Sequence, residues 1–459
     1  MQKIDLLNGR IVPTLIRLTL PIMGTSLVQM AYNLIDMIWI GRVSADAVAA
    51  VGAAGMYLWI SQGLATIPRI GSQVKSAQAI GAGDIDKAAC YAQAAFHMGG
   101  VLMAVFMMVC LLFNGPLIGF FKLNSPDIVA DARSYLFIVA IGYVFTFTSQ
   151  IYTGLFTAMG ASTTVLRSTS VGLVANAVLD PLFIFGVGPL PNMGVAGAAL
   201  ATILAQGIVC IVFIFAGKKD TFLFPHVHLL TKSRFSAWKD VARIGLPVAL
   251  QSIFFSFLSM VIARLVAAWG DAAIAAQKVG SQIESISFTT AEGFGSAINA
   301  FIAQNFGAGK TDRIKKGYST AVGIMVIWSI FTSIVLIVFP APLMRIFVSE
   351  TNVIEIGVSY LRIMGFSQTL MCIEITSAGA FQGLGRPLPP AISGILGNLA
   401  RIPMAILLSA TVLGLDGIWW SITISSCAKG IVVFTWLMVV LRRFLAAKDD
   451  KIRTEQQNR

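Results

Sequence analysis

Apolar segments long enough to cross a lipid bilayer recur twelve times along this chain of 459 residues. A membrane-spanning helix needs roughly 20 consecutive apolar residues, and the connections between these segments are short enough for twelve to fit. Only 12% of the residues are charged, against roughly a quarter in soluble domains. The pattern predicts an all-α integral membrane protein, and it excludes a soluble enzyme and a disordered chain.

A long polar connection divides the twelve segments into six and six. We therefore predict a first six-helix bundle over 1–217, a linker over 218–241, and a second six-helix bundle over 242–459 that ends in a short basic tail. Four sequence patterns of the first half return in the second, in the same order and 220 to 226 positions later: Leu20-Pro21 with Leu246-Pro247, GAGDIDK (81–87) with GAGKTDR (307–313), Asn176 and Pro181 with Asn398 and Pro403, and GVAG (194–197) with GLDG (414–417).

This repeat has a geometric consequence. Because six is an even number of spans, both copies must point the same way across the membrane. We therefore expect the two bundles to be related by a pseudo-two-fold axis along the membrane normal, an arrangement typical of secondary transporters.

The basic residues predict the orientation of the chain. With a cytoplasmic N-terminus, 24 of the 33 Lys and Arg residues fall in the cytoplasmic loops and tails and only five in the loops of the other side. Cytoplasmic loops of membrane proteins carry an excess of Lys and Arg. We expect both termini and the linker to be cytoplasmic, which also explains the net charge of +12 without a nucleic-acid partner.

Five acidic residues lie within the apolar segments, where a charged group is costly unless it is paired or protonated. Asp36 shares a helix face with Gln29, Tyr32 and Asn33, which precede it by seven, four and three positions. Asp180 follows Asn176 by one helical turn and directly precedes Pro181. The remaining three are Glu284, Glu292 and Glu374.

The two aspartates are expected to lie at a similar depth. Both segments run from inside to outside, and both aspartates lie five or six residues before a glycine that ends the segment. Two desolvated carboxyl groups close together favour the protonated form, so the pair could load and release a proton. The alternative is that either aspartate only caps a helix end near the headgroups.

The second half carries a balanced set of buried charges. Glu284, Glu292 and Glu374 accompany Arg264, Arg401 and Lys429. They could form internal ion pairs, or the acids could contribute to a cavity for cationic substrates together with Gln29 and Asn33. Two histidines in the linker, His226 and His228, are too few to predict a metal site, and no catalytic motif indicates an enzyme.

The segment LPIMGTSLVQMAYNLIDMIWIGR (20–42), the segment LDPLFIFG (179–186), the paired GAG loops and the six-plus-six repeat resemble the multidrug and toxic compound extrusion (MATE) family. The resemblance covers nearly the whole chain. It implies a V-shaped pair of six-helix bundles and cation-coupled efflux of amphipathic, usually cationic, compounds across a prokaryotic inner membrane.

The resemblance also implies site residues. In proton-linked members the coupling site matches Tyr32, Asp36, Asn176, Asp180 and Thr202 of this chain. Other members place a sodium site in the second bundle, with acids on the seventh and tenth spans, whereas here the seventh span has no acid and Glu374 is the only acid of the tenth.

We therefore expect a monomeric multidrug antiporter of the inner membrane that exchanges small organic cations for protons and uses no cofactor. The alternatives are a sodium-coupled drug exporter, or a lipid-linked saccharide flippase of the same superfamily with a basic cavity formed by Arg264, Arg401 and Lys429.

Overall fold

The computed structural model describes residues 3–123, 125–186 and 191–457. In this part of the chain the fold is entirely helical. The first half contains α1 (Ile11–Gly41), α2 (Ala45–Gly81), α3 (Ile85–Leu112), α4 (Asn114–Gly119), α5 (Pro126–Ala158), α6 (Ser162–Phe185), α7 (Gly194–Lys218) and the 3-10 helix η1 (Phe224–His226). The second half contains α8 (Phe235–Ala267), α9 (Asp271–Gly307), α10 (Thr311–Val338), α11 (Pro340–Arg345), α12 (Thr351–Gly383), α13 (Leu388–Ser409) and α14 (Leu415–Gln457).

The all-α membrane fold predicted from the sequence is confirmed. In the described residues twelve α-helices have 22 to 43 residues, and eleven of them are long and apolar enough to cross a membrane. The exception is α9, which carries the acids Asp271, Glu284 and Glu292 together with Lys278. These charges lower its hydropathy although its 37 residues exceed the length of a span.

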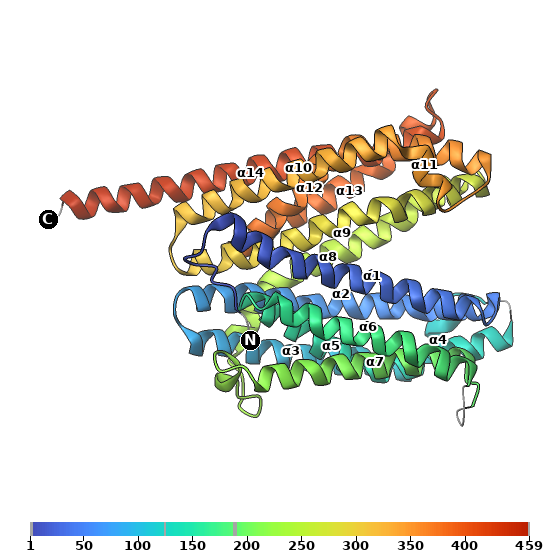
Figure 1. Cartoon of the computed structure of the whole chain (residues 1–459), viewed down its shortest axis with the longest axis horizontal. Coiled ribbons are helices and arrows are strands. Elements are labelled where there is room, and N and C mark those ends of the chain that lie inside the picture. The colour runs from blue at the N-terminus through green and yellow to red at the C-terminus, as the bar shows by residue number, and fades with distance from the viewer. Residues whose placement is uncertain (1–2, 124, 187–190, 458–459) are drawn as a thin grey trace. The chain divides into compact units, whose positions relative to one another are not determined.

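The sequence repeat has a counterpart in the packing of the helices (Figure 1). In the first half α5 packs against α2, α3 and α7, and α6 packs against α7. In the second half α12 packs against α9, α10 and α14, and α13 packs against α14. The six-residue helices α4 and α11 also follow equivalent long helices, α3 and α10. Each half therefore builds the same arrangement around its fourth long helix.

The chain forms two compact units. Unit 1 comprises the residues up to Asp5 and Leu20–Ala249, and unit 2 comprises Leu6–Thr19 and the residues from Leu250 onward. The first turns of α1 therefore belong to unit 2 and the first half of α8 to unit 1, which differs from the limits that we predicted at 217 and 242. Both helices contain a proline close to the point of exchange, Pro21 and Pro247, where a helix loses a hydrogen bond and can bend.

The interior of unit 1 combines small and aromatic side chains. Alanines of α2 and α3 are fully buried, among them Ala77, Ala88, Ala92 and Ala95. Because lipid gives no hydrophobic drive between helices, such small residues stabilise the unit by letting backbones approach closely. α2 and α3 pack in this way against α5, α5 packs against α7, and α6 packs against α7. Helices α5, α6 and α7 carry most of the polar cluster described next.

Candidate functional site

The polar centre of unit 1 is built on α6. Asn176 and Asp180 lie one turn apart on this helix and are fully buried, with 0% and 1% of their surface exposed. Asn176 Nδ2 donates a hydrogen bond of 3.0 Å to Asp180 Oδ1. Pro181 follows within the helix and leaves a backbone carbonyl without its helical partner one turn earlier. The helix therefore holds a fixed amide–carboxyl pair in its apolar surroundings.

The second carboxyl group comes from α1. The half-buried Asp36 lies beside Asp180 and Asn176. Three buried oxygen atoms of this group have no hydrogen-bond partner, namely Asp36 Oδ1, Asn176 Oδ1 and Asp180 Oδ2. Among the described residues neither aspartate takes part in an ion pair with a basic side chain. Buried polar atoms normally have partners, and these three oxygens can accept a hydrogen bond or bind a cation.

Two tyrosines and a threonine complete the cluster. Tyr32, one turn before Asp36 on α1, donates a hydrogen bond of 3.3 Å from its hydroxyl to the carbonyl of Thr202 on α7. The side chain of Thr202 also interacts with the hydroxyl of Tyr135, which lies on α5 and is 4% exposed. The structure thus brings together Tyr32, Asp36, Asn176, Asp180 and Thr202, the five residues that the sequence analysis assigned to one site.

Tyr135 was not predicted. It lies close enough to Asp36 and Asp180 to interact with both carboxyl groups electrostatically. Nothing in the sequence distinguishes it from the other tyrosines of the chain, because its contact with Thr202 joins helices that are separated by 67 positions. Only the packing of α5 against α7 shows that it belongs to the site.

The substrate-cavity candidates do not join this cluster. Gln29 and Asn33 lie on α1 with exposed side chains. Glu284, Glu292 and Glu374 belong to unit 2, so the acids of the two halves form separate groups. Glu292 is exposed on α9, whereas Glu284 accepts hydrogen bonds from Tyr360 (3.1 Å) and Gln368 (3.2 Å).

Unit 2 contains a buried ionic network. Lys429 Nζ on α14 lies 3.2 Å from Glu374 Oε1 on α12, which confirms the predicted pairing for this lysine. Arg401 on α13 donates hydrogen bonds to Ser425 (3.2 Å) and Ser426 (2.9 Å) and lies near Glu374 and Glu284. The network therefore satisfies its buried charges within the unit.

The prediction that Arg264 is paired with an acid inside the membrane is wrong. Its side chain is exposed in the last turn of α8, and among the described residues it forms no ion pair. The helix ends three residues later at Ala267, so the long side chain can place its charge at the membrane interface.

Comparisons with known proteins agree with this architecture. The MatE family model matches residues 21–182 and 247–407. The chain is 29% identical over 416 residues to the probable multidrug resistance protein NorM of Thermotoga maritima, an alignment that covers 88% of this chain and 87% of that protein. It is 27% identical over 446 residues to the probable multidrug resistance protein YpnP of Bacillus subtilis, covering 93% and 96%.

A solved structure of an outward-facing multidrug resistance MATE family transporter of the MOP superfamily has the same fold. It matches with a TM-score of 0.90 at 22% identity and covers 97% of this chain and 99% of that chain. The structural match therefore includes both halves of the repeat.

Proposed function

Since the chain belongs to the MatE family of multidrug efflux transporters, we propose that it is a secondary antiporter that exports amphipathic, mostly cationic organic compounds in exchange for protons. As a member of a transporter family it is not an enzyme. We further propose that this multi-pass protein is a monomer of the inner membrane. The 24-to-5 distribution of basic residues supports cytoplasmic termini.

The observation that carries the proposal is the pair of adjacent carboxyl groups with unpartnered oxygens, Asp36 Oδ1 and Asp180 Oδ2. Two ionised carboxylates side by side repel each other, and each loses its hydration inside the membrane. A proton on one carboxyl turns it into a hydrogen-bond donor for the other. Proton binding therefore removes the repulsion and satisfies the unpartnered oxygens together.

Proton binding at this pair would control the charge of unit 1. Without the proton, the two ionised carboxylates carry two negative charges that attract an organic cation. The proton halves this charge and so weakens the attraction, which favours release of the cation. Gln29 and Asn33, exposed on the same helix as Asp36, are our candidates for contacts with the substrate. Each proton that enters along the membrane potential supplies about 2.3 kcal/mol per 100 mV.

One observation favours a sodium-coupled exporter as the second candidate. Asn176 Oδ1 is a third unpartnered oxygen beside the two carboxyl groups, and a small hard cation is bound by oxygen ligands of this kind. The second unit offers less support for sodium, because Glu374 is already paired with Lys429. The same pairing gives little support to a flippase with a free basic cavity.

Transport in liposomes tests the proposal. Purified protein is reconstituted, and ethidium transport is followed by fluorescence under either a pH gradient or a sodium gradient at matched membrane potential. We expect the pH gradient alone to drive transport. Transport that requires sodium and ignores the pH gradient would overturn the proton proposal and leave the sodium alternative.

Variants locate the coupling site. We expect Asp36→Asn and Asp180→Asn each to reduce pH-driven transport at least tenfold, and the double variant to lose little more, because the two carboxyl groups titrate as one unit. Asp131→Asn is the matched control, since Asp131 is an exposed acid of unit 1 on α5. Wild-type proton release and transport in both single variants would refute the assignment of this pair.

A further inference from the structure

The end of the linker is fixed against the side of α3 within unit 1. Gln93 on α3 is 9% exposed, and its Nε2 donates hydrogen bonds to the backbone carbonyls of His228 (2.7 Å) and Thr231 (2.6 Å). The same nitrogen lies 2.7 Å from the hydroxyl oxygen of Thr231. One buried amide therefore holds the linker at two positions of its backbone.

A histidine one turn further along α3 holds the next residues of the linker. His97 Nε2 lies 2.8 Å from the carbonyl oxygen of Leu229, and Nδ1 lies 2.9 Å from Ser233 Oγ. Because a carbonyl only accepts, Nε2 of the neutral ring carries the proton, and Nδ1 accepts a hydrogen bond from the Ser233 hydroxyl. Trp238 Nε1 in turn donates a hydrogen bond of 2.6 Å to Ser233 Oγ. The linker is therefore tied to α3 from His228 to Ser233.

The length of α3 places these contacts at the edge of the hydrocarbon. The helix carries no charged residue from Ala88 to Leu112, and the 20 residues that end at Leu112 begin at Gln93. Since roughly 20 residues cross the hydrocarbon core, Gln93 lies near its boundary and His97 one turn inside. Polar groups that face lipid are costly, and the linker supplies their hydrogen-bond partners. The linker segment therefore lies where the acyl chains meet the headgroups.

The side chains that this segment presents outward are apolar and basic. Leu230 is fully exposed, Phe235 is 81% exposed and Leu229 is 48% exposed. Lys232 and Arg234, which lie between the exposed apolar residues in the sequence, are also exposed. In the part of the chain that the structure describes, neither of them forms an ion pair. The segment thus combines large apolar groups in contact with solvent with two positive charges that no acid neutralises.

We propose that residues 228–235 form a lipid anchor, which binds the anionic phospholipid surface of the membrane. Leu230 and Phe235 insert among the acyl chains at the boundary, as the apolar face of an interfacial segment does. Lys232 and Arg234 extend their charged ends to the lipid phosphates. The charges favour an anionic surface as the partner, because the linker carries no acid between residues 221 and 239.

The lipid anchor fixes the beginning of a membrane-spanning helix at the membrane surface. Phe235 is the first residue of α8, and the segment before it is tied to α3 by Gln93 and His97. Lipid binding therefore acts on α3 and α8 together, at the point where the linker enters the second run of spans. This binding concerns the lipid and does not depend on which ion drives transport.

A fluorescent probe beside Phe235 tests the lipid anchor without any transport measurement. The dye NBD, which is brighter in lipid than in water, is attached to a cysteine introduced at the exposed Ser236, after replacement of the five native cysteines. The full chain is placed in nanodiscs of phosphatidylcholine with an increasing fraction of phosphatidylglycerol. We expect the fluorescence to rise with this fraction. Lys232→Gln and Arg234→Gln should each lower the apparent affinity for phosphatidylglycerol about fivefold.

Three further variants make the result specific. Lys232→Arg keeps the charge and should resemble the wild type, and Lys87→Gln removes an exposed charge at the start of α3 and should have no effect. Leu230→Ser combined with Phe235→Ser removes only exposed side chains, and it should keep the fluorescence low in every mixture. Unchanged affinity in both Lys232→Gln and Arg234→Gln would overturn the lipid anchor. Low fluorescence of the unsubstituted segment in every mixture would also overturn it and favour a protein partner. Both membrane surfaces of a nanodisc have the same lipids, so neither result depends on the proposed orientation.

Discussion

Substitution of Glu374 and substitution of Lys429, the two members of the buried ion pair of unit 2, should lower the stability of the protein by different amounts. Glu374 and Lys429 are 10% and 9% exposed at their side chains and 3.2 Å apart. Arg401 lies near Glu374 as a second cation and is held by two serines. If Lys429 is removed, Arg401 is still available as a base near Glu374. If Glu374 is removed, no free acid remains near Lys429, because Glu284 is already hydrogen-bonded to Tyr360 and Gln368.

The expected magnitudes follow from this arrangement. Glu374→Gln leaves Lys429 without its partner beside a second buried cation, and removing one member of a buried pair costs about 3 to 5 kcal/mol. Lys429→Met removes a cation while Arg401 remains near Glu374, so we expect a smaller cost of about 1 to 2 kcal/mol. Methionine also keeps the apolar stem that lies over Gly397. The double variant should lose no more than Glu374→Gln alone.

Thermal unfolding in detergent, followed by tryptophan fluorescence, measures these differences. For a domain of this size about 1 kcal/mol corresponds to a shift of roughly 2 to 4 °C, so Glu374→Gln should lower Tm by about 6 to 20 °C and Lys429→Met by clearly less. Glu355→Gln is the control, because Glu355 is an exposed acid on the same helix. Equal shifts for the two single variants, with an additive double variant, would refute the reasoning.

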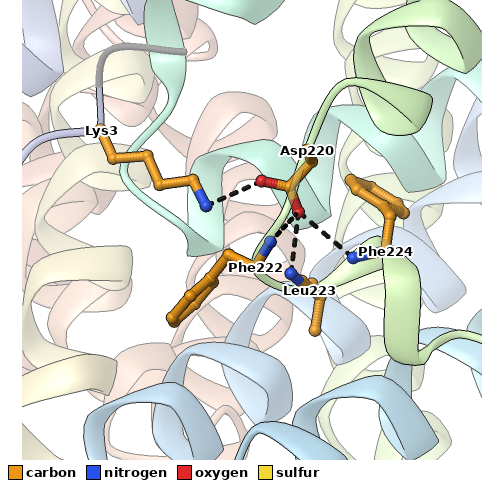
Figure 2. Close-up of polar contacts among 5 residues, drawn as sticks. All are labelled: Lys3, Asp220, Phe222, Leu223 and Phe224. Atoms are coloured by element: carbon orange, nitrogen blue, oxygen red, sulfur yellow. Dashed lines mark hydrogen bonds and ion pairs between the residues drawn. The ribbon is translucent and has the colours of Figure 1, made fainter.

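Three other predictions follow from the described contacts. Gly397→Ala should lower Tm, since its Cβ would lie 2.4 Å from Cγ of Lys429 and overpacking costs about 1 to 3 kcal/mol; an unchanged Tm would contradict this. A cysteine at Lys232, exposed in the linker, should react with an impermeant maleimide only in opened cells, and reaction in intact cells would reverse the predicted orientation. Because the pKa of Asp220 is lowered, the stability from its contact with Lys3 is present above the ordinary Asp pKa of about 3.9 and is lost only as pH falls through the lower pKa of the folded state. Lys3 Nζ lies 2.7 Å from Asp220 Oδ1 (Figure 2). The difference in Tm between wild type and Lys3→Gln should therefore be the same at about pH 5.5 and pH 8, and its loss at the lower pH would contradict the assignment.

The sequence by itself determined the helical membrane fold and its division into two repeated halves. The bilayer requires long apolar segments with satisfied backbones, so their number and spacing can be read along the chain. The similar depth of Asp36 and Asp180 was also predictable, because both lie at a similar distance from the glycine that ends their segment. The depth of a residue in the membrane follows from its position along its spanning segment, so it can be estimated from the sequence.

Only the tertiary structure decided which side chains meet at a given depth. Tyr135 lies in the polar cluster because α5 packs against α7. Lys429 forms its ion pair with Glu374 and not with another acid. Lys3 forms an ion pair with Asp220, which lies more than 200 positions later in the chain. The assignment of the first turns of α1 to unit 2 and of the first half of α8 to unit 1 has the same origin. Rotation of each helix about its axis and the choice of its neighbours depend on how whole helix surfaces pack, which no local pattern in the sequence specifies.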